Sequence, residues 1–159
     1  MDVLNPNTLK RLFDHGSRDY PRECCGMVFT DGTVHEADNI QQTLHEQCPE
    51  TYRRNAATGF AFSIADNRML GDSFETDNPV QVIYHSHPDV GAYFSQQDRD
   101  KALFCGEPIF PVAHLVLDIR AGTPVGAKLF RFVEGDFQCT ETFNEEGLRI
   151  HKSNTPLLT

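Results

Sequence analysis

Apolar and polar residues along the chain follow patterns that predict both helices and strands. Near the N-terminus the apolar residues that recur at helical spacing are Leu9, Leu12 and Phe13. Asn5 or Asn7 is a suitable N-cap for this helix, which we expect to end near Gly16. Residues 24–30 are apolar and rich in strand formers.

A hairpin is predicted from the turn signal that follows this first strand. Asp31-Gly32 is a strong two-residue turn sequence, and residues 33–37 after it again favour a strand. Further along, residues 60–64 alternate between apolar and polar, which predicts another strand. We expect residues 65–70 to form a short helix that Gly71 closes.

The most apolar strand is predicted at residues 80–84, a continuous β-branched and aromatic sequence typical of the buried centre of a sheet. It leads directly into His85-Ser86-His87-Pro88. Ser95 is then a good N-cap for a helix over residues 96–104. Three further strands are predicted over residues 112–119, 127–133 and 137–143.

Together these elements predict an α+β fold, an α-β-α sandwich with a central mixed β-sheet flanked by helices. The chain has 159 residues, which fits one domain. It shows no repeat and no Ser/Gly linker. We therefore expect a single domain over residues 1–143 and a polar, loosely held C-terminal tail over residues 144–159.

The bulk composition narrows the possible partners. Apolar residues make up 39% and charged residues 23% of the chain, as in soluble globular proteins. The formal net charge of -9 argues against a nucleic-acid partner, because such a partner requires a Lys/Arg-rich surface. The longest apolar segments are too short to span a bilayer, so no membrane partner is expected.

The cysteines and the N-terminus favour a cytoplasmic protein. The first residues are polar and interrupted by Pro6, unlike a signal peptide. The five cysteines are odd in number and scattered, which does not fit a disulfide framework. Reduced thiols are the simplest interpretation. A thiol nucleophile at Cys24 or Cys25 has no assigned base, so Cys25 is interpreted as a small buried residue.

The residues that carry chemistry follow the central strand. His85 and His87 point to the same face because side chains alternate along a strand. Asp98, in the first turn of the following helix, can supply a third ligand. Three protein ligands leave one position of a tetrahedral metal site open, which is typical of catalytic zinc.

Each of these residues also has a purely structural interpretation. A His-x-His pair among seven histidines can be two hydrogen-bonded core residues. Ser95 can be only a helix cap, and Glu23 can be a solvated charge before a strand. His114, within an apolar strand, is interpreted as a core histidine rather than a fourth ligand.

The wider pattern resembles a known family. His85-x-His87, seven residues, and then Ser95-x-x-Asp98 match the JAMM motif of the MPN+ metallopeptidases without a gap. Upstream, Pro21-Arg22-Glu23-Cys24-Cys25-Gly26 is similar to the P-x-E-x-C-G segment of the short prokaryotic members. The resemblance covers nearly the whole chain and implies the MPN fold, which is similar to that of cytidine deaminases.

The resemblance also implies roles for five residues. His85, His87 and Asp98 occupy the zinc-ligand positions, with one Zn²⁺ per chain. Glu23 occupies the position of the general acid/base, and Ser95 that of the residue that stabilises the tetrahedral intermediate. These roles agree with the chemistry of carboxylates and hydroxyls beside a Lewis acid.

The implied activity is hydrolysis of the amide bond after the C-terminal Gly-Gly of a ubiquitin-like or sulfur-carrier protein. The enzyme would act as an isopeptidase or as a processing peptidase. In some relatives the reaction releases cysteine. Such tails are extended and narrow, and they bind as an added strand. The alternatives are a non-catalytic MPN scaffold, a zinc cell-wall peptidase and an enzyme of phosphate esters. All five functional positions are filled, which argues against the scaffold, and a single-metal acidic site argues against phosphate chemistry.

Overall fold

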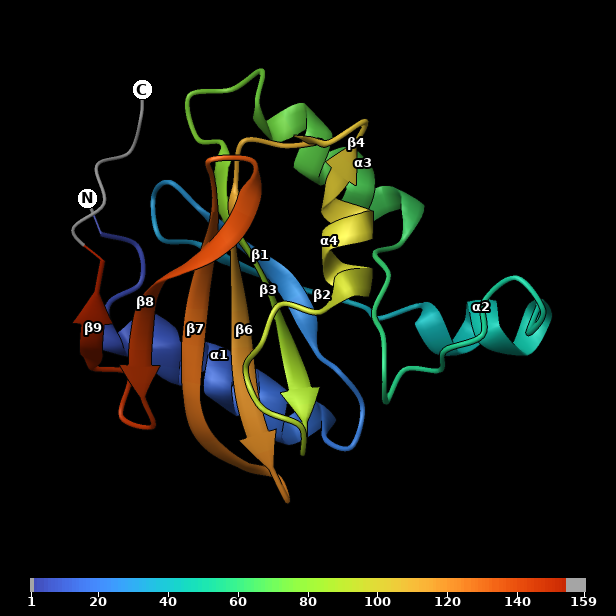
Figure 1. Cartoon of the computed structure of the whole chain (residues 1–159), viewed down its shortest axis with the longest axis horizontal. Helices are drawn as coiled ribbons and strands as arrows, with labels where there is room; N and C mark the ends of the chain where they lie inside the picture. The colour runs from blue at the N-terminus through green and yellow to red at the C-terminus, as the bar shows by residue number, and fades with distance from the viewer. Residues whose placement is uncertain (1, 154–159) are drawn as a thin grey trace.

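The computed structural model describes residues 2–153, which form a central sheet with helices on both faces (Figure 1). The helices are α1 (Pro6–Asp19), α2 (Gln41–Gln47), α3 (Ile64–Ser73) and α4 (Gln96–Ala102). The strands of the main sheet are β1 (Cys25–Phe29), β2 (Val34–Ala37), β3 (Val80–Pro88), β6 (Ala113–Arg120), β7 (Thr123–Val133), β8 (Asp136–Asn144) and β9 (Arg149–Lys152). The predicted α-β-α sandwich is confirmed.

The strand order of the sheet is β2-β1-β3-β6-β7-β8-β9. Neighbouring strands are antiparallel except β3 and β6, which run parallel, so the sheet is mixed. The prediction that residues 80–84 form a central strand is confirmed. The strand continues to Pro88, so His85 and His87 belong to it. The predicted hairpin is present as β1 and β2.

Helix α1 begins as predicted, at one of the two candidate caps. The side chain of Asn5 accepts a hydrogen bond from the backbone N–H of Thr8 at 3.0 Å. The helix continues past Gly16, where a Cβ atom would lie only 3.0 Å from the side chain of Ile119. A glycine there lets the helix lie close against the sheet instead of ending it.

Two hydrophobic cores lie on the two faces of the sheet. Alternate residues of β3 divide between them, because Tyr84 packs with α1 whereas Ile83 packs with Leu70 of α3. A third hydrophobic cluster joins the segment that precedes α4 to strands β6, β7 and β8. Its buried members are Phe94, Val116, Phe130 and Phe137. Strand β3 is therefore covered on both sides, and its C-terminal end lies beneath α4.

The strand predicted over residues 60–64 is wrong. Ile64 is 81% exposed and opens α3 instead. The side chain of Ser63 accepts a hydrogen bond from the N–H of Asp66, which fixes the start of that helix. The helix also passes through Gly71 and ends at Ser73, so the predicted closure at Gly71 is wrong as well.

Two further differences lie at the ends of predicted segments. Helix α4 ends at Ala102, because residues 103–104 (β4) pair with residues 107–108 (β5) in a separate two-stranded sheet. Part of the predicted loose tail forms β9, which pairs with β8. Residues 154–159 lie outside the described residues. Between residues 2 and 153, no helix has the length and apolar character needed to cross a membrane.

Candidate metal centre

The two histidines at the end of β3 meet on one face of the strand. Their Nε2 atoms are 3.1 Å apart, and both side chains are buried. Ser86 between them points to the other face, where its Oγ accepts a hydrogen bond from the backbone N–H of Cys24 at 2.8 Å. The alternation of a strand thus separates the paired imidazoles from a structural serine.

The capping of α4 brings Asp98 to the same place. Ser95 is the N-cap, and its hydroxyl accepts a hydrogen bond from the N–H of Asp98 at 3.0 Å. In return, Asp98 Oδ2 accepts a hydrogen bond from the N–H of Ser95 at 3.0 Å, which completes a capping box. The same oxygen lies 3.3 Å from His85 Nε2 and 3.5 Å from His87 Nε2.

The outer nitrogens of the two imidazoles have different surroundings. His87 Nδ1 lies 3.0 Å from the carbonyl oxygen of Gly91, so it carries the hydrogen and leaves Nε2 with a free lone pair. Gly91 holds a φ of 92°, which is readily reached by glycine. His85 Nδ1 is buried without a hydrogen-bond partner, and the ring of His85 stacks on Phe60 with centroids 4.5 Å apart.

Glu23 faces the histidine pair from the segment that precedes β1. It is buried, and one carboxylate oxygen and the nearest nitrogens of His85 and His87 all lie within 4.8 Å of one another. Removal from water raises the pKa of Glu23 to about 8, although the nearby charge of His87 acts in the opposite direction. A carboxyl group with this pKa can both accept and donate a proton near neutral pH.

Charges within the cluster perturb the other members too. Burial alone would raise the pKa of Asp98, but the interactions with His85 and His87 hold it far below its usual range. Burial lowers the pKa of His85. For His87 the effect of burial is outweighed by the nearby carboxylates of Asp98 and Glu23, which favour its protonated form, so its pKa is raised. The electrostatic environment favours positive charge between these groups.

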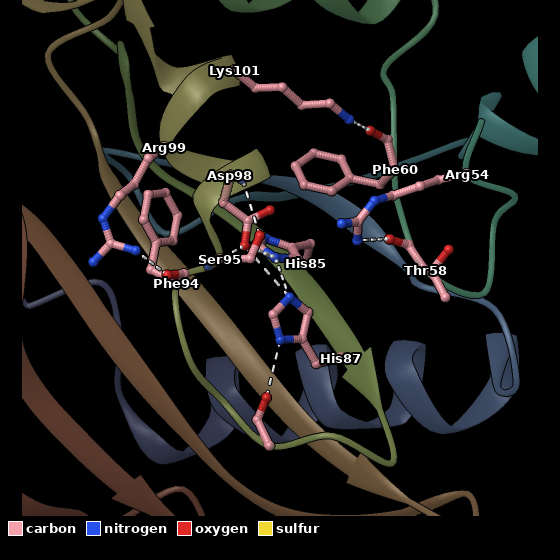
Figure 2. A network of polar contacts seen from close by, with 11 residues as sticks. Arg54, Thr58, Phe60, His85, His87, Phe94, Ser95, Asp98, Arg99 and Lys101 are labelled. Atoms are coloured by element: carbon pink, nitrogen blue, oxygen red, sulfur yellow. Dashed lines mark hydrogen bonds and ion pairs between the residues drawn. The ribbon is translucent and has the colours of Figure 1, made fainter. Parts of the chain in front are cut away.

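The donor set fits a tetrahedral cation. In a tetrahedral zinc site with metal–ligand bonds of about 2.0–2.2 Å, ligand atoms lie about 3.3–3.6 Å apart. The three candidate ligand atoms are separated by 3.1, 3.3 and 3.5 Å, and two imidazole nitrogens with one carboxylate oxygen are ligands that zinc accepts. Figure 2 shows His85, His87 and Asp98 pointing toward one another from β3 and α4.

Two hollows adjoin the cluster. A cleft of about 110 Å³ opens over it and is lined by Glu23, Arg54, Thr58, His87, Tyr93 and Ser95, among others. Behind His85 lies a mainly apolar cavity of about 240 Å³, whose wall includes Phe60, Phe62, Leu70, Ile83, Phe94 and Phe110. The first hollow contains the candidate acid/base Glu23 and the hydroxyl-bearing Ser95. The apolar wall of the second helps to shield His85 from water.

The residues that the sequence set aside lie apart from this cleft. Cys24 and Cys25 are fully buried, and burial raises the pKa of both thiols, that of Cys24 to about 12. Neither is a thiolate at neutral pH. His114 lies against the rings of Phe94 and Phe137, and burial lowers its pKa to about 4. His114 is therefore neutral at neutral pH.

One buried histidine in α1 has a structural role that no sequence pattern indicated. His15 Nδ1 lies 2.8 Å from the hydroxyl of Tyr84, and its Nε2 lies 3.2 Å from Asp19 Oδ2. The contact with Tyr84 connects α1 to β3, and the contact with Asp19 lies within α1. Arg54, which lines the cleft, was also missed, because it lies in an irregular segment without periodicity.

The chain belongs to the family of prokaryotic homologues of the JAB domain, whose model matches residues 6–128. The resemblance to the JAMM/MPN+ proteins is thereby confirmed. The chain is 31% identical over 116 residues to proteins named CysO-cysteine peptidase from Mycobacterium tuberculosis and Mycobacterium bovis, covering 72% of this chain and 70% of each relative. The family and these relatives indicate a hydrolase.

Two solved structures share the fold. A solution structure of a protein from Desulfitobacterium hafniense has a TM-score of 0.59 and 16% identity, covering 85% of this chain and 86% of that one. A solution structure of a protein from Salinibacter ruber has a TM-score of 0.54 and 23% identity, covering 94% of this chain and 97% of that one. At these identities the likeness concerns the fold alone.

Proposed function

We propose that this protein is a zinc-dependent peptidase that hydrolyses the amide bond after the C-terminal Gly-Gly of a ubiquitin-like or sulfur-carrier protein. The observation that carries the proposal is the mutual separation of 3.1–3.5 Å among His85 Nε2, His87 Nε2 and Asp98 Oδ2. These three atoms are the proposed ligands. A zinc ion held there supplies a Lewis acid that activates water and polarises a carbonyl group.

The residues around the ligands have separate tasks in this reaction. Glu23 takes a proton from the attacking water and passes it to the leaving amine, a task that suits its raised pKa. The hydroxyl of Ser95 donates a hydrogen bond to the oxygen that becomes negative as the carbonyl carbon turns tetrahedral. The backbone N–H of Asp98 already fixes the position of that hydroxyl.

The shape of the cleft supports a glycine tail as the bound segment. Its volume is about 110 Å³, and the half-exposed ring of Tyr93 forms part of its wall. Glycine lacks a Cβ atom, so a Gly-Gly segment can bring its backbone closer to the cluster than other residues can. The relatives named CysO-cysteine peptidase support a carrier-type substrate.

The test combines zinc analysis with hydrolysis of a sulfur-carrier–cysteine adduct and of a ubiquitin-like fusion. We expect one zinc per chain in the wild type. His85→Ala and Asp98→Ala should lose zinc and activity together. Glu23→Gln should keep its zinc while kcat falls by about 100-fold or more, because the proton transfer is lost. His151→Ala, at an exposed histidine of β9, is the matched control and should retain both.

Three results would contradict all or part of the proposal. Full turnover in Glu23→Gln would remove this residue from the reaction. A wild-type protein that binds zinc but hydrolyses neither substrate would favour the scaffold alternative, and hydrolysis of muropeptides alone would favour the cell-wall peptidase.

A further inference from the structure

Arg54 reaches the cleft from a loop that is fixed to the backbone of Glu23. Ala56, two residues after Arg54, accepts a hydrogen bond on its carbonyl oxygen from the N–H of Glu23 at 2.7 Å. The buried side chain of Gln41 donates a hydrogen bond to the carbonyl oxygen of Arg54 at 2.8 Å. The backbone of Arg54 is thus held at a fixed place relative to Glu23.

A second amide strengthens this connection. Asn39 Nδ2 donates hydrogen bonds to the carbonyl oxygens of Glu23 and Gly59, each at 3.0 Å. Its Oδ1 accepts hydrogen bonds from the N–H groups of Gln41 and Ala61 at 3.0 and 3.1 Å. One side chain therefore joins the segment of Glu23 to the segment that follows Arg54.

Most N–H donors of the Arg54 guanidinium group are available to a ligand. One of its nitrogens donates a hydrogen bond to the carbonyl oxygen of Thr58 at 3.2 Å. Throughout residues 2–153, no carboxylate lies within ion-pair distance of this group. Figure 2 shows its side chain extending from the loop toward the histidine cluster. Arginine offers five N–H donors in a planar fork that matches a carboxylate.

Lys101, the other cation near Glu23, has its own partners outside the cleft. Lys101 donates its hydrogen bond to the carbonyl oxygen of Phe60 and lies over the ring of that residue, 5.1 Å from the centroid. Lys101 lines the apolar cavity behind His85, whereas Arg54 lines the cleft with Glu23. Arg54 is therefore the cation that faces a bound substrate.

In the proposed reaction the leaving amine departs beside Glu23, which lines the same cleft as Arg54. In the proposed reaction the C–N bond breaks, the water oxygen joins the carbonyl carbon, and the proton taken by Glu23 goes to the departing nitrogen. In a departing amino acid, the carboxylate carbon lies about 2.5 Å from that nitrogen. A free α-carboxylate on that amino acid therefore lies in the cleft that Glu23 and Arg54 both line.

We propose that Arg54 binds the free α-carboxylate of the departing residue, which makes the site selective for releasing a single C-terminal amino acid from a Gly-Gly tail. This inference rests on the proposed peptidase function and names its substrate class. A lysine joined through its side-chain amine within a protein brings no carboxylate to this position. Cleavage of such conjugates is therefore disfavoured.

The test uses a ubiquitin-like carrier protein extended after its Gly-Gly by one cysteine, made with a free acid or an amidated C-terminus. We expect the wild type to cleave the acid about 10- to 100-fold more efficiently than the amide, as the loss of a charged hydrogen bond predicts. Arg54→Gln should cleave both at the rate of the amide, chiefly through a raised KM. Arg54→Lys should retain part of the preference.

A matched control and a binding measurement complete the design. Arg53→Gln removes the neighbouring exposed arginine, which does not line the cleft, and should leave the preference unchanged. In Glu23→Gln, calorimetry should show tighter binding of the acid than of the amide, and adding Arg54→Gln should abolish the difference.

The outcomes separate the two proposals. Equal cleavage of acid and amide by the wild type, or better cleavage of a lysine isopeptide, overturns the role of Arg54 and leaves the peptidase function standing. If the wild type cleaves neither the acid, nor the amide, nor a lysine isopeptide of the same carrier, the peptidase function is overturned, and the role of Arg54 with it.

Discussion

The hydroxyl of Ser95 caps α4 and, in the proposed reaction, also stabilises the oxyanion, and different substitutions can separate these two tasks. It accepts a hydrogen bond from the N–H of Asp98, which stabilises the start of α4, and its own hydrogen remains available for the reacting carbonyl oxygen. Backbone capping needs only an acceptor or an unhindered backbone, whereas oxyanion stabilisation needs the hydrogen.

We expect Ser95→Ala to lose about 1 kcal/mol of unfolding free energy, and Ser95→Gly to lose only a few tenths, because glycine is a tolerated N-cap. Both should lower kcat by about 100-fold, since both lack the hydroxyl. Ser95→Thr should retain stability and most of the turnover. Denaturant unfolding, zinc content and single-turnover rates check this; wild-type kcat in Ser95→Gly would show that the hydroxyl is only a cap.

At the scale of elements, Gly26 fixes how closely β1 lies to its neighbours. A Cβ atom there would lie 2.4 Å from the carbonyl oxygen of His35 on β2 and 2.4 Å from the hydroxyl of Tyr84 on β3. No positive φ occurs at Gly26, so the position does not require the backbone freedom of glycine. The requirement is for space between three strands.

Two glycine substitutions should therefore have opposite effects. Gly26→Ala should lower the free energy of unfolding by about 1–3 kcal/mol, because the strands must move apart. In α3, Gly71 has nothing within 4 Å of a built Cβ atom, so Gly71→Ala should raise stability by about 0.5–1 kcal/mol. Thermal and denaturant unfolding of both variants provide the measurement, and equal shifts of the same sign would contradict the packing argument.

The sequence predicted the elements whose pattern is local and missed those that depend on distant partners. Strand β3 was predicted because its apolar residues are continuous, and the spacing of His85 and His87 gave their shared face directly. Residues 60–64 alternate like a strand, yet the capping by Ser63 starts a helix there. The position of Arg54 depends on hydrogen bonds from the side chains of Asn39 and Gln41. Hydrophobic periodicity does not predict such contacts.

At the scale of the whole molecule, Arg149 connects both ends of the described chain. Its Nε lies 2.7 Å from a carboxylate oxygen of Glu141 on β8, and its Nη2 lies 2.6 Å from Asp2. Glu141 is only 5% exposed, so its charge depends on partners. Arg131, the other arginine nearby, is 3.9 Å away. The pairing holds β9 against the sheet.

Arg149→Met should lower the free energy of unfolding by about 1–3 kcal/mol, because it leaves a buried carboxylate with a weaker partner. Adding Glu141→Gln should restore part of this loss, since the uncompensated charge is then absent. Strands β6 and β7 separate β8 from β3, so turnover per bound zinc should stay at the wild-type value. Denaturant unfolding and steady-state kinetics check both statements; additive losses in the double variant would contradict the coupling.

Helix α2 and the loop after it protrude from the body of the molecule (Figure 1), and Arg54 and Thr58 beyond them line the cleft. The amide side chains of Asn39 and Gln41 hold the base of this protruding segment through hydrogen bonds. Its tip, around residues 48–53, is exposed. Protein engineers can therefore graft longer sequences at the tip, or randomise it, with little risk to folding. Selection from such libraries would then test whether this protruding segment sets the substrate preference of the proposed peptidase.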